Sequence, residues 1–244
     1  MISQLLGSAN IQLINNYIYI PEKIKHIKLD IGLSYSAPMS QTWLSTESNL
    51  LVFGFEPNPE SVTSILSPTN KKREPCHGDV LDYKYIVEKR AFIIPAAVGK
   101  DETESIDFYI TQRDVGCSSL YKPKTECHAV EKTIKVPVIK LSSFFKLFPF
   151  HQFPIIEYIK IDAQGSDFDI LLGAEEYLTN HVVYVTVETD GNQYEGADLD
   201  NPDVVYNYMI SQGFERVHHS NTSDATYLNS KFKQYSGVFI FQRG

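Results

Sequence analysis

Short apolar runs rich in β-branched residues alternate along this chain with stretches of helical periodicity. Val-Val-Tyr-Val-Thr-Val at 182–187 is the clearest run, and so continuous an apolar strand is typical of a parallel sheet buried on both faces. Strands and helices in alternation predict an α/β fold with a doubly wound, mostly parallel sheet. The predicted strands are Ile24–Leu29, Leu51–Phe55, Ala91–Pro95, Ile156–Ile161, Val182–Val187 and Gly237–Gln242.

Stretches with helical spacing follow several of these strands. Ser166 is the expected N-cap of one helix, in which apolar residues recur at every third or fourth position. Gly213 is the expected end of a later helix, since glycine readily adopts the left-handed conformation common there. The predicted helices cover about 39–46, 59–66, 166–179 and 202–212.

The alternation changes between about residues 105 and 140. Ile106–Ile110 and Thr133–Ile139 predict two further strands around a polar loop. A small β insertion at this point of a doubly wound sheet is expected near the carboxyl edge, where such folds bind ligands. We expect a single domain over 1–244, with an N-terminal extension over about 1–23.

Charge and composition narrow the class of protein. Lys and Arg number 22 against 30 Asp and Glu, which gives a formal net charge of −8, whereas a nucleic-acid binder needs a basic face. The sequence has no long apolar span and no signal peptide, and its three cysteines fit no metal-binding spacing. We therefore expect a soluble, cytoplasmic protein with no nucleic-acid partner, no membrane association and no metal.

A glycine turn follows the first predicted strand, in Lys28-Leu29-Asp30-Ile31-Gly32-Leu33-Ser34-Tyr35-Ser36. Glycine and serine remove side-chain bulk, which lets backbone N–H groups approach a ligand closely. The turn has one glycine only, so the dinucleotide fingerprint G-x-G-x-x-G is absent. Taken alone, the turn is explained equally well by ligand binding and by a tight strand–helix connection capped by Asp30.

A second carboxylate, Glu56, ends the next predicted strand. An acidic residue at this point of a doubly wound sheet typically accepts the hydroxyl hydrogens of an adenosine ribose. Pro57 and Pro59 stop the strand and open the next helix, which fixes where Glu56 points. Carboxylates at two adjacent strand ends favour a nucleoside-containing cofactor over a pair of unrelated surface acids.

Taken in order, these segments resemble a known family. The runs LDIGLSYSAPMSQTWL, VFGFEPNP, PAAVG, GCSSL, YIKIDAQGSDFDILLGAEEYL and VYVTVETD are similar to segments of the FkbM family of S-adenosylmethionine-dependent methyltransferases. The most specific is KIDAQG before an amphipathic helix, which resembles the KID-x-EG signature of that family. The resemblance implies a class I methyltransferase-like, Rossmann-like sheet with a reversed last strand. Ala225–Leu228 and Gly237–Gln242 would supply its terminal antiparallel pair.

The resemblance also implies S-adenosyl-L-methionine as the cofactor. The first turn would hold its methionine part, Glu56 its ribose hydroxyls, and the end of the third strand its adenine. Ser34 and Ser36 depart from the family pattern, which has Asn and a second Gly at these positions, although serine is small enough for close approach. The residues expected around the cofactor are Asp30, Gly32, Ser34, Ser36, Glu56, Asn58, Ala97 and Val98.

Three residues are candidates for the chemistry. Asp162 and Glu188 end the fourth and fifth strands, beside the expected position of the methyl group. Lys160 lies on the same face as Asp162, and a lysine inside a central strand is costly unless paired. The two form either a proton-transfer or substrate-orienting pair, or a structural ion pair. Gln164 replaces the glutamate of the family signature, which removes one carboxylate that would act on substrate.

We expect an S-adenosylmethionine-dependent O-methyltransferase whose acceptor is a hydroxyl on a sugar-bearing or other small metabolite. An NAD(P)-dependent Rossmann oxidoreductase is one alternative, disfavoured by the missing glycines of the fingerprint. A non-catalytic cofactor-binding module of the same fold is another, suggested by the altered first turn and by Gln164.

Overall fold

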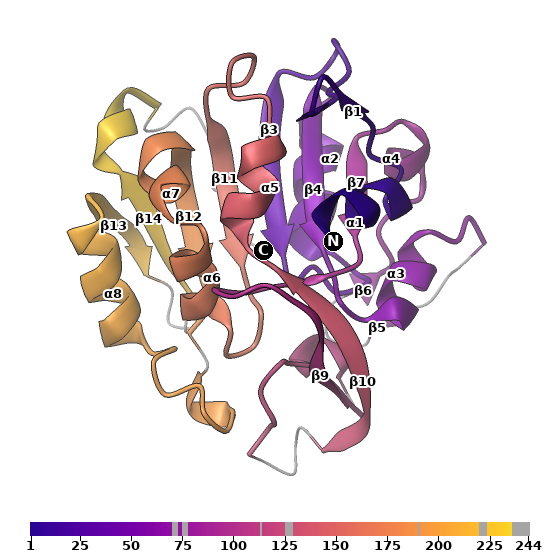
Figure 1. Ribbon diagram of the computed structural model, residues 1–244, viewed down its shortest axis with the longest axis vertical. Coiled ribbons are helices and arrows are strands. Elements are labelled where there is room, and N and C mark those ends of the chain that lie inside the picture. The colour runs from indigo at the N-terminus through magenta and orange to yellow at the C-terminus, as the bar shows by residue number, and fades with distance from the viewer. Residues whose placement is uncertain are drawn as a thin grey trace.

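The computed structural model describes residues 1–69, 73–74, 78–112, 114–124, 129–189, 191–219 and 224–235. At the centre of these residues lies a sheet of seven strands in the order β13-β14-β12-β11-β3-β4-β7 (Figure 1). β14 is antiparallel to both of its neighbours, and the remaining pairs are parallel. The predicted doubly wound, mostly parallel sheet with a reversed last strand is therefore confirmed.

The strands of this sheet agree closely with the predicted apolar runs. Ile156–Ile161 and Val182–Val187 match to the residue, and the other predicted strands within the described residues shift by a few positions at most. The strands are β3 (His26–Ile31), β4 (Leu50–Phe55), β7 (Ala91–Ile94), β11 (Ile156–Ile161), β12 (Val182–Val187), β13 (Phe214–His219) and β14 (Ala225–Asn229).

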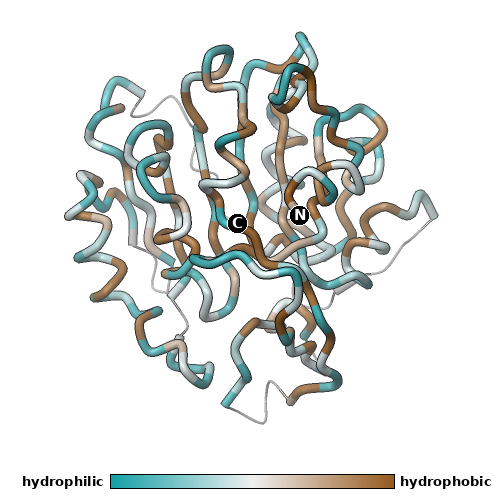
Figure 2. The backbone as a smooth tube through the Cα atoms, in the orientation of Figure 1, coloured by the Kyte–Doolittle hydropathy of each residue, from teal (hydrophilic) through white to brown (hydrophobic). Residues whose placement is uncertain are grey.

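Helices cover both faces of the sheet, and each face has its own hydrophobic core. β4 shows the alternation, since Phe53 packs in the core under α1, α5, α6, α7 and α8, whereas Val52 packs in the core under α2, α3 and α4. Hydrophobic residues accordingly gather along the central strands (Figure 2). The helices are α1 (Ile2–Ser8), α2 (Pro38–Thr46), α3 (Pro59–Ile65), α4 (Lys84–Val87), α5 (Leu141–Leu147), α6 (Asp167–Gly173), α7 (Glu176–His181) and α8 (Pro202–Ser211).

The terminal antiparallel pair was predicted with one wrong partner. Ala225–Asn229 pairs with Phe214–His219 and with β12, so the strand after Gly213 takes the place expected for Gly237–Gln242. Residues 237–242 lie outside the described residues. The segment 214–219 was missed because its Phe-Glu-Arg-Val-His-His sequence is mostly polar, as suits a strand at the sheet edge.

The single helix predicted over 166–179 is also wrong, because it is two helices, α6 and α7. Glu175 separates them with a φ of 53° and a ψ of −143°, a conformation that no α-helix contains. Gly173 ends α6 against the loop after β8, where an added Cβ would lie 2.2 Å from the Gly99 carbonyl oxygen. The chain therefore turns at this close contact although the apolar periodicity continues.

The predicted insertion forms a second sheet at one end of the main sheet (Figure 1). β9 (Thr103–Thr111) and β10 (Val130–Ile139) pair antiparallel, and β10 also pairs parallel with β8 (Ala97–Val98). A short 3₁₀ helix, Val115–Cys117, follows β9. Because β8 comes directly after β7, this insertion is anchored at the carboxyl edge of the main sheet, as expected.

The N-terminal extension contains α1 and a hairpin of β1 (Leu13–Ile14) and β2 (Tyr17–Ile18). Asn15 and Asn16 form its turn with φ values of 52° and 67°. Positive φ at both turn residues matches the twist of the flanking strands, and asparagine tolerates it better than most residues.

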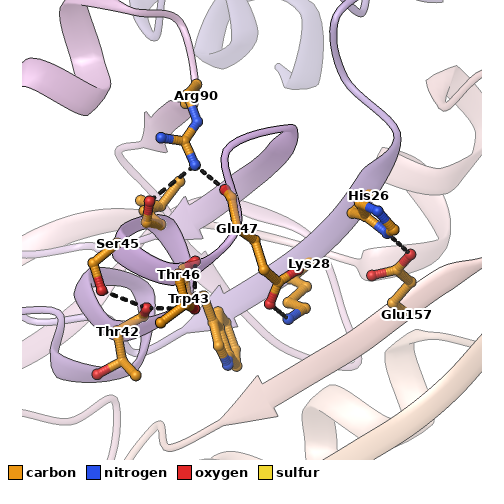
Figure 3. A network of polar contacts seen from close by, with 10 residues as sticks. His26, Lys28, Thr42, Trp43, Ser45, Thr46, Glu47, Arg90 and Glu157 are labelled. Carbon is orange, nitrogen blue, oxygen red and sulfur yellow. Dashed lines mark hydrogen bonds and ion pairs between the residues drawn. The ribbon is translucent and has the colours of Figure 1, made fainter. Parts of the chain in front are cut away.

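Charged groups near the amino ends of the strands tie β3 and β11 to α2 (Figure 3). His26 Nδ1 lies 2.5 Å from Glu157 Oε1, and Lys28 on the same strand is paired with Glu47. Arg90 donates from Nη2 to the Leu44 carbonyl at 2.9 Å. These contacts fasten the edge of the sheet opposite to the insertion.

Gly32 closes the turn after β3 and sets how closely β3 and β11 meet. Its φ is +73°, and a Cβ added there would lie 1.7 Å from the backbone oxygen of Asp162. Neither the backbone angle nor the space accommodates a side chain. The glycine of the predicted turn is therefore required by the fold itself.

Replacing Gly32 with alanine is expected to lower the free energy of unfolding by about 3 kcal/mol or more, since strain at positive φ adds to a backbone clash. Gly7 is the matched control because nothing lies within 4 Å of its added Cβ. Gly7→Ala, inside a helix, should raise stability by about 0.5–1 kcal/mol. Urea denaturation of both variants measures this, and equal effects would contradict the account.

Candidate active site

Backbone hydrogen bonds continue past the strand ends and bring three carboxylates to one edge. Asp162 N–H donates to the Ile31 carbonyl at 3.0 Å, and Glu188 N–H donates to the Ile161 carbonyl at 3.0 Å. Glu56 N–H donates to the Ile94 carbonyl at 3.1 Å. Asp162 and Glu188 end the neighbouring strands β11 and β12, as expected, and Glu56 ends β4 at the same edge. The expected partner of Glu56 at the adjacent strand end, Asp30, lies inside β3 instead.

A cavity opens at this edge, between the strand ends and the insertion. The space enclosed between these elements is about 490 Å³, a figure that includes open solvent. It is lined by Ile31, Gly32, Ser34, Phe55, Glu56, Pro57, Ala96, Ala97, Val98, Phe108, Val115, Gly116, Ser118, Leu120, Asp162, Ala163 and Ser166.

Six of the eleven predicted site residues lie in the cavity wall, and five do not. Those in the wall are Gly32, Ser34, Glu56, Ala97, Val98 and Asp162. The other five, which are not among the lining residues, are Asp30, Ser36, Asn58, Lys160 and Glu188. Asp30 is part of β3 rather than its end, and it is buried on the face that packs against α2.

Glu56 is buried, and both of its carboxylate oxygens accept backbone hydrogen bonds. Oε2 accepts from Ser34 N–H at 2.8 Å, and Oε1 accepts from Asn58 N–H at 2.7 Å. The Asn58 side chain meanwhile caps α3 by accepting from Glu60 N–H at 3.0 Å. Glu56 therefore joins the turn after β3 to the turn after β4.

Two hydroxyl groups in the cavity wall have no hydrogen-bond partner within the described part of the chain. They are the buried Oγ atoms of Ser34 and Ser166. Ser166 is at the predicted N-cap of α6, but its side chain makes no capping bond. Buried hydroxyls are costly without a partner, so two of them at one cavity indicate a polar ligand.

Lys160 joins two carboxylates beside the cavity. Its Nζ lies 2.9 Å from Asp162 Oδ2 and 3.6 Å from Asp30 Oδ1, and it donates to the Gly32 carbonyl at 3.2 Å. Asp30 Oδ2 also accepts from the Ser40 hydroxyl at 2.5 Å. The predicted Lys160–Asp162 ion pair is thus present.

The charges at this cluster shift two pKa values in opposite directions. Burial alone would lower the pKa of Lys160, but the carboxylates of Asp162 and Asp30 outweigh burial and raise it. Burial alone would raise the pKa of Asp162, but the Lys160 charge and hydrogen bonds from neighbouring side chains hold it well below its ordinary value. Asp162 is therefore an anion at neutral pH.

Asp167 holds the loop that follows Asp162. Its Oδ1 accepts from Ala163 N–H at 2.8 Å, and its Oδ2 accepts from Gly165 N–H at 3.1 Å. Burial and the nearby Asp200 carboxylate raise the pKa of Asp167 well above its ordinary value. The loop is therefore fixed by a buried carboxyl group rather than by the cap expected of Ser166.

The insertion supplies apolar wall residues that sequence reasoning did not assign. Phe108, Val115 and Leu120 line the cavity, together with Ser118. The alternation of Phe108 and Ile110 along a strand is the signal that would have placed one face of β9 inward. Leu120 lies in a loop and carries no such signal.

A second ionisable cluster lies at the opposite edge of the sheet (Figure 3). His26, Glu47 and Glu157 each offer a ligand atom within 4.8 Å of the others, as a metal site would require. Lys28 already supplies a cation to this cluster through its pair with Glu47.

In the described residues, no helix combines the length and apolar character that crossing a membrane requires.

The chain matches one family of known proteins. The model of the methyltransferase FkbM domain family covers residues 37–216. A comparison with curated proteins finds no match. Among solved structures, the methyltransferase FkbM from Methylobacillus flagellatus KT is 13% identical with a TM-score of 0.46, over 90% of this chain and 47% of that one. This chain therefore spans about half of its length.

Two further solved structures are similar at the same distant level. An antibiotic-related methyltransferase is 11% identical with a TM-score of 0.35, over 93% of this chain and 89% of the other. A mutant of the 16S rRNA (adenine(1408)-N(1))-methyltransferase from Catenulisporales acidiphilia is 11% identical with a TM-score of 0.37, over 89% of this chain and 95% of the other. Because the sequence identities and TM-scores of all three structures are low, the family assignment rests on the match to the family model alone.

Removing the Lys160 charge leaves two carboxylates without their cation. Lys160→Met is expected to lower the free energy of unfolding by about 3 kcal/mol at neutral pH. Asp162 has a lowered pKa in the folded protein, so its contribution is present above its unfolded value near pH 4 and is lost as pH falls. The deficit of the variant should therefore shrink on acidification.

Lys135→Met is the matched control, because Lys135 pairs with Asp107 at 2.9 Å on an exposed strand. Its loss should cost less than about 1 kcal/mol. Urea denaturation at neutral and acid pH distinguishes the two. Equal losses of unfolding free energy at both pH values would show that the ion pairs of Lys160 stabilise the fold no more than an exposed pair does.

Proposed function

Because the chain belongs to the FkbM methyltransferase family, we propose that it transfers a methyl group from S-adenosyl-L-methionine to a hydroxyl of a small metabolite, such as a sugar-bearing one. The observation that carries this proposal is the cavity at the carboxyl edge. There, a buried carboxylate, a glycine turn and two unpartnered hydroxyls face one space. When bound, the cofactor supplies an electrophilic methyl group on a sulfonium.

The cavity wall fits the parts of such a cofactor. Glu56, which lines the cavity, would accept ribose hydroxyls, and Ala97 and Val98 offer an apolar surface for adenine. The turn at Gly32 and the Ser34 hydroxyl would hold the methionine end. Ser166 offers a second hydroxyl in the cavity wall. Asp30, Ser36 and Asn58 would act behind this wall by fixing it.

The acceptor is best described as a small molecule with an apolar part. Phe108, Val115 and Leu120 give the insertion side of the cavity an apolar lining. The charged side chains among the described lining residues are Glu56 and Asp162, and the net charge of the chain is −8, which opposes a nucleic-acid acceptor. The hydroxyl of the acceptor would be held by Asp162, which reaches the cavity.

Asp162 would orient this hydroxyl rather than act as a strong base. A carboxylate with a lowered pKa binds a proton weakly, so it accepts a hydrogen bond but takes the proton poorly. Glu188, held beside Asp162, is the second candidate for proton removal. Most of the acceleration would then come from alignment of the hydroxyl with the methyl group.

Asp162→Asn is expected to lower turnover about 10²-fold or more, because the amide presents a donor where the hydroxyl needs an acceptor. A screen of hydroxylated metabolites with labelled methyl donor identifies the acceptor, and analysis of the product locates the methyl group on oxygen. Cofactor affinity should change less than about tenfold. Wild-type turnover in both Asp162→Asn and Glu188→Gln, or a methyl group found on nitrogen, would contradict this proposal.

A further inference from the structure

The side chain of Gln164 bridges the two carboxylates at the candidate active site. Its Nε2 donates to Asp162 Oδ1 at 2.8 Å and to Glu188 Oε2 at 3.0 Å. A primary amide has two hydrogens, so both are used. The nitrogen atom of Gln164 therefore bridges two carboxyl groups from different strand ends, which also hydrogen-bond each other.

Gln164 is itself held from the other side. Its Oε1 accepts from the Tyr194 hydroxyl at 2.6 Å, and its backbone carbonyl accepts from the Ser119 hydroxyl at 2.6 Å. Its φ is 56°, a left-handed conformation that costs a non-glycine residue energy and recurs at functional sites. Both Gln164 and Tyr194 are at least nine-tenths buried.

These partners fix the orientation of the amide. Reversing it would place Oε1 against the carboxylates of Asp162 and Glu188, while Nε2 faced the Tyr194 hydroxyl. A glutamate at 164 would similarly place three carboxylates together. The amide is thus the group that satisfies both acids without adding charge.

Charged side chains surround the Gln164 amide, and a neutral group at this position adds no further repulsion between them. Asp162 is paired with Lys160, which also meets Asp30, and the buried Asp167 and Asp200 lie on the other side of the loop. The charged and titratable groups around Gln164 are Asp30, Lys160, Asp162, Asp167, Glu188, Tyr194 and Asp200.

We propose that Gln164 is a positioning residue that holds the Asp162 and Glu188 carboxylates together for the acceptor, and that Tyr194 sets its orientation. The role in turnover rests on the proposed methyl transfer, whereas the bridge itself does not. Gln164 touches neither substrate nor cofactor in this account. It acts through the two carboxylates that its amide bridges.

The bridge is tested first by thermal melting, which needs no acceptor. In Gln164→Glu the new carboxyl group meets two carboxylates, so its pKa rises in the folded state. A raised carboxyl pKa makes stability fall as pH rises between the unfolded and folded values. We expect the variant to melt about 3–6 °C below the wild type at about pH 8 and much closer to it at about pH 5.

Gln152→Glu is the matched control, because it makes the same change at an exposed position. It should melt within about 1 °C of the wild type at both pH values. A Gln164→Glu deficit that is absent, or that is the same at both pH values, would overturn the bridge.

Turnover on the acceptor found in the labelled-methyl screen then tests positioning. Gln164→Glu should lower kcat at least about tenfold, and Tyr194→Phe about three- to tenfold, with S-adenosylhomocysteine affinity within about threefold for both. The acid limb of the pH–rate profile should move to higher pH in Gln164→Glu alone. Wild-type turnover in Gln164→Glu would overturn the positioning role.

Failure of the proposed function has a separate signature. If the wild type binds no S-adenosylhomocysteine and methylates none of the hydroxylated acceptors, the methyltransfer proposal fails and the positioning role with it. The melting comparison would still decide whether Gln164 bridges the two carboxylates.

Discussion

The turn after β3 touches the backbone at the end of β11, and this contact fixes the geometry of the carboxyl edge. Gly32 has no room for a side chain because the Asp162 carbonyl oxygen occupies that space. The same turn donates Ser34 N–H to Glu56 at 2.8 Å, which links it to the end of β4. Three strand ends are thereby held around one cavity before any ligand arrives, and a site so preorganised loses little freedom on binding.

Charge balance is the second condition that this edge must meet. Asp30, Asp162 and Glu188 bring negative charge to the sheet, and Lys160 provides the cation between Asp30 and Asp162. Gln164 then joins Asp162 to Glu188 through a neutral amide. The two interactions have different consequences. The Lys160 ion pair lowers the basicity of Asp162, whereas the Gln164 hydrogen bonds fix where both carboxylates lie.

Much of this arrangement could be predicted from local patterns. Unbroken β-branched runs gave β11 and β12 to the residue, and a period of two along a strand placed Lys160 and Asp162 on one face. β13 was missed because an edge strand has little need for apolar residues. Asp30 was predicted to end its strand, but β3 continues to Ile31, so its side chain is turned toward α2.

The contacts that complete the site are not local. Tyr194, which directly follows a short 3₁₀ helix, reaches Gln164 from thirty residues away in the chain, and no periodicity relates the two. Phe108 and Leu120 reach the cavity from the insertion, whose path over the edge depends on the pairing of β10 with β8. Sequence patterns place side chains within an element, whereas contacts between loops depend on the assembled fold.

Calorimetric titration of S-adenosylhomocysteine into the wild type, Glu56→Ala and Glu60→Ala tests most directly that the cavity holds the cofactor. We expect a wild-type binding free energy of about −7 to −9 kcal/mol. Glu56→Ala should lose about 1–3 kcal/mol, because charge-assisted bonds to ribose hydroxyls are removed. Glu60, exposed on α3, should be replaced without effect. No binding heat for the wild type alongside clear binding of NADH, or equal affinity in all three proteins, would contradict the account.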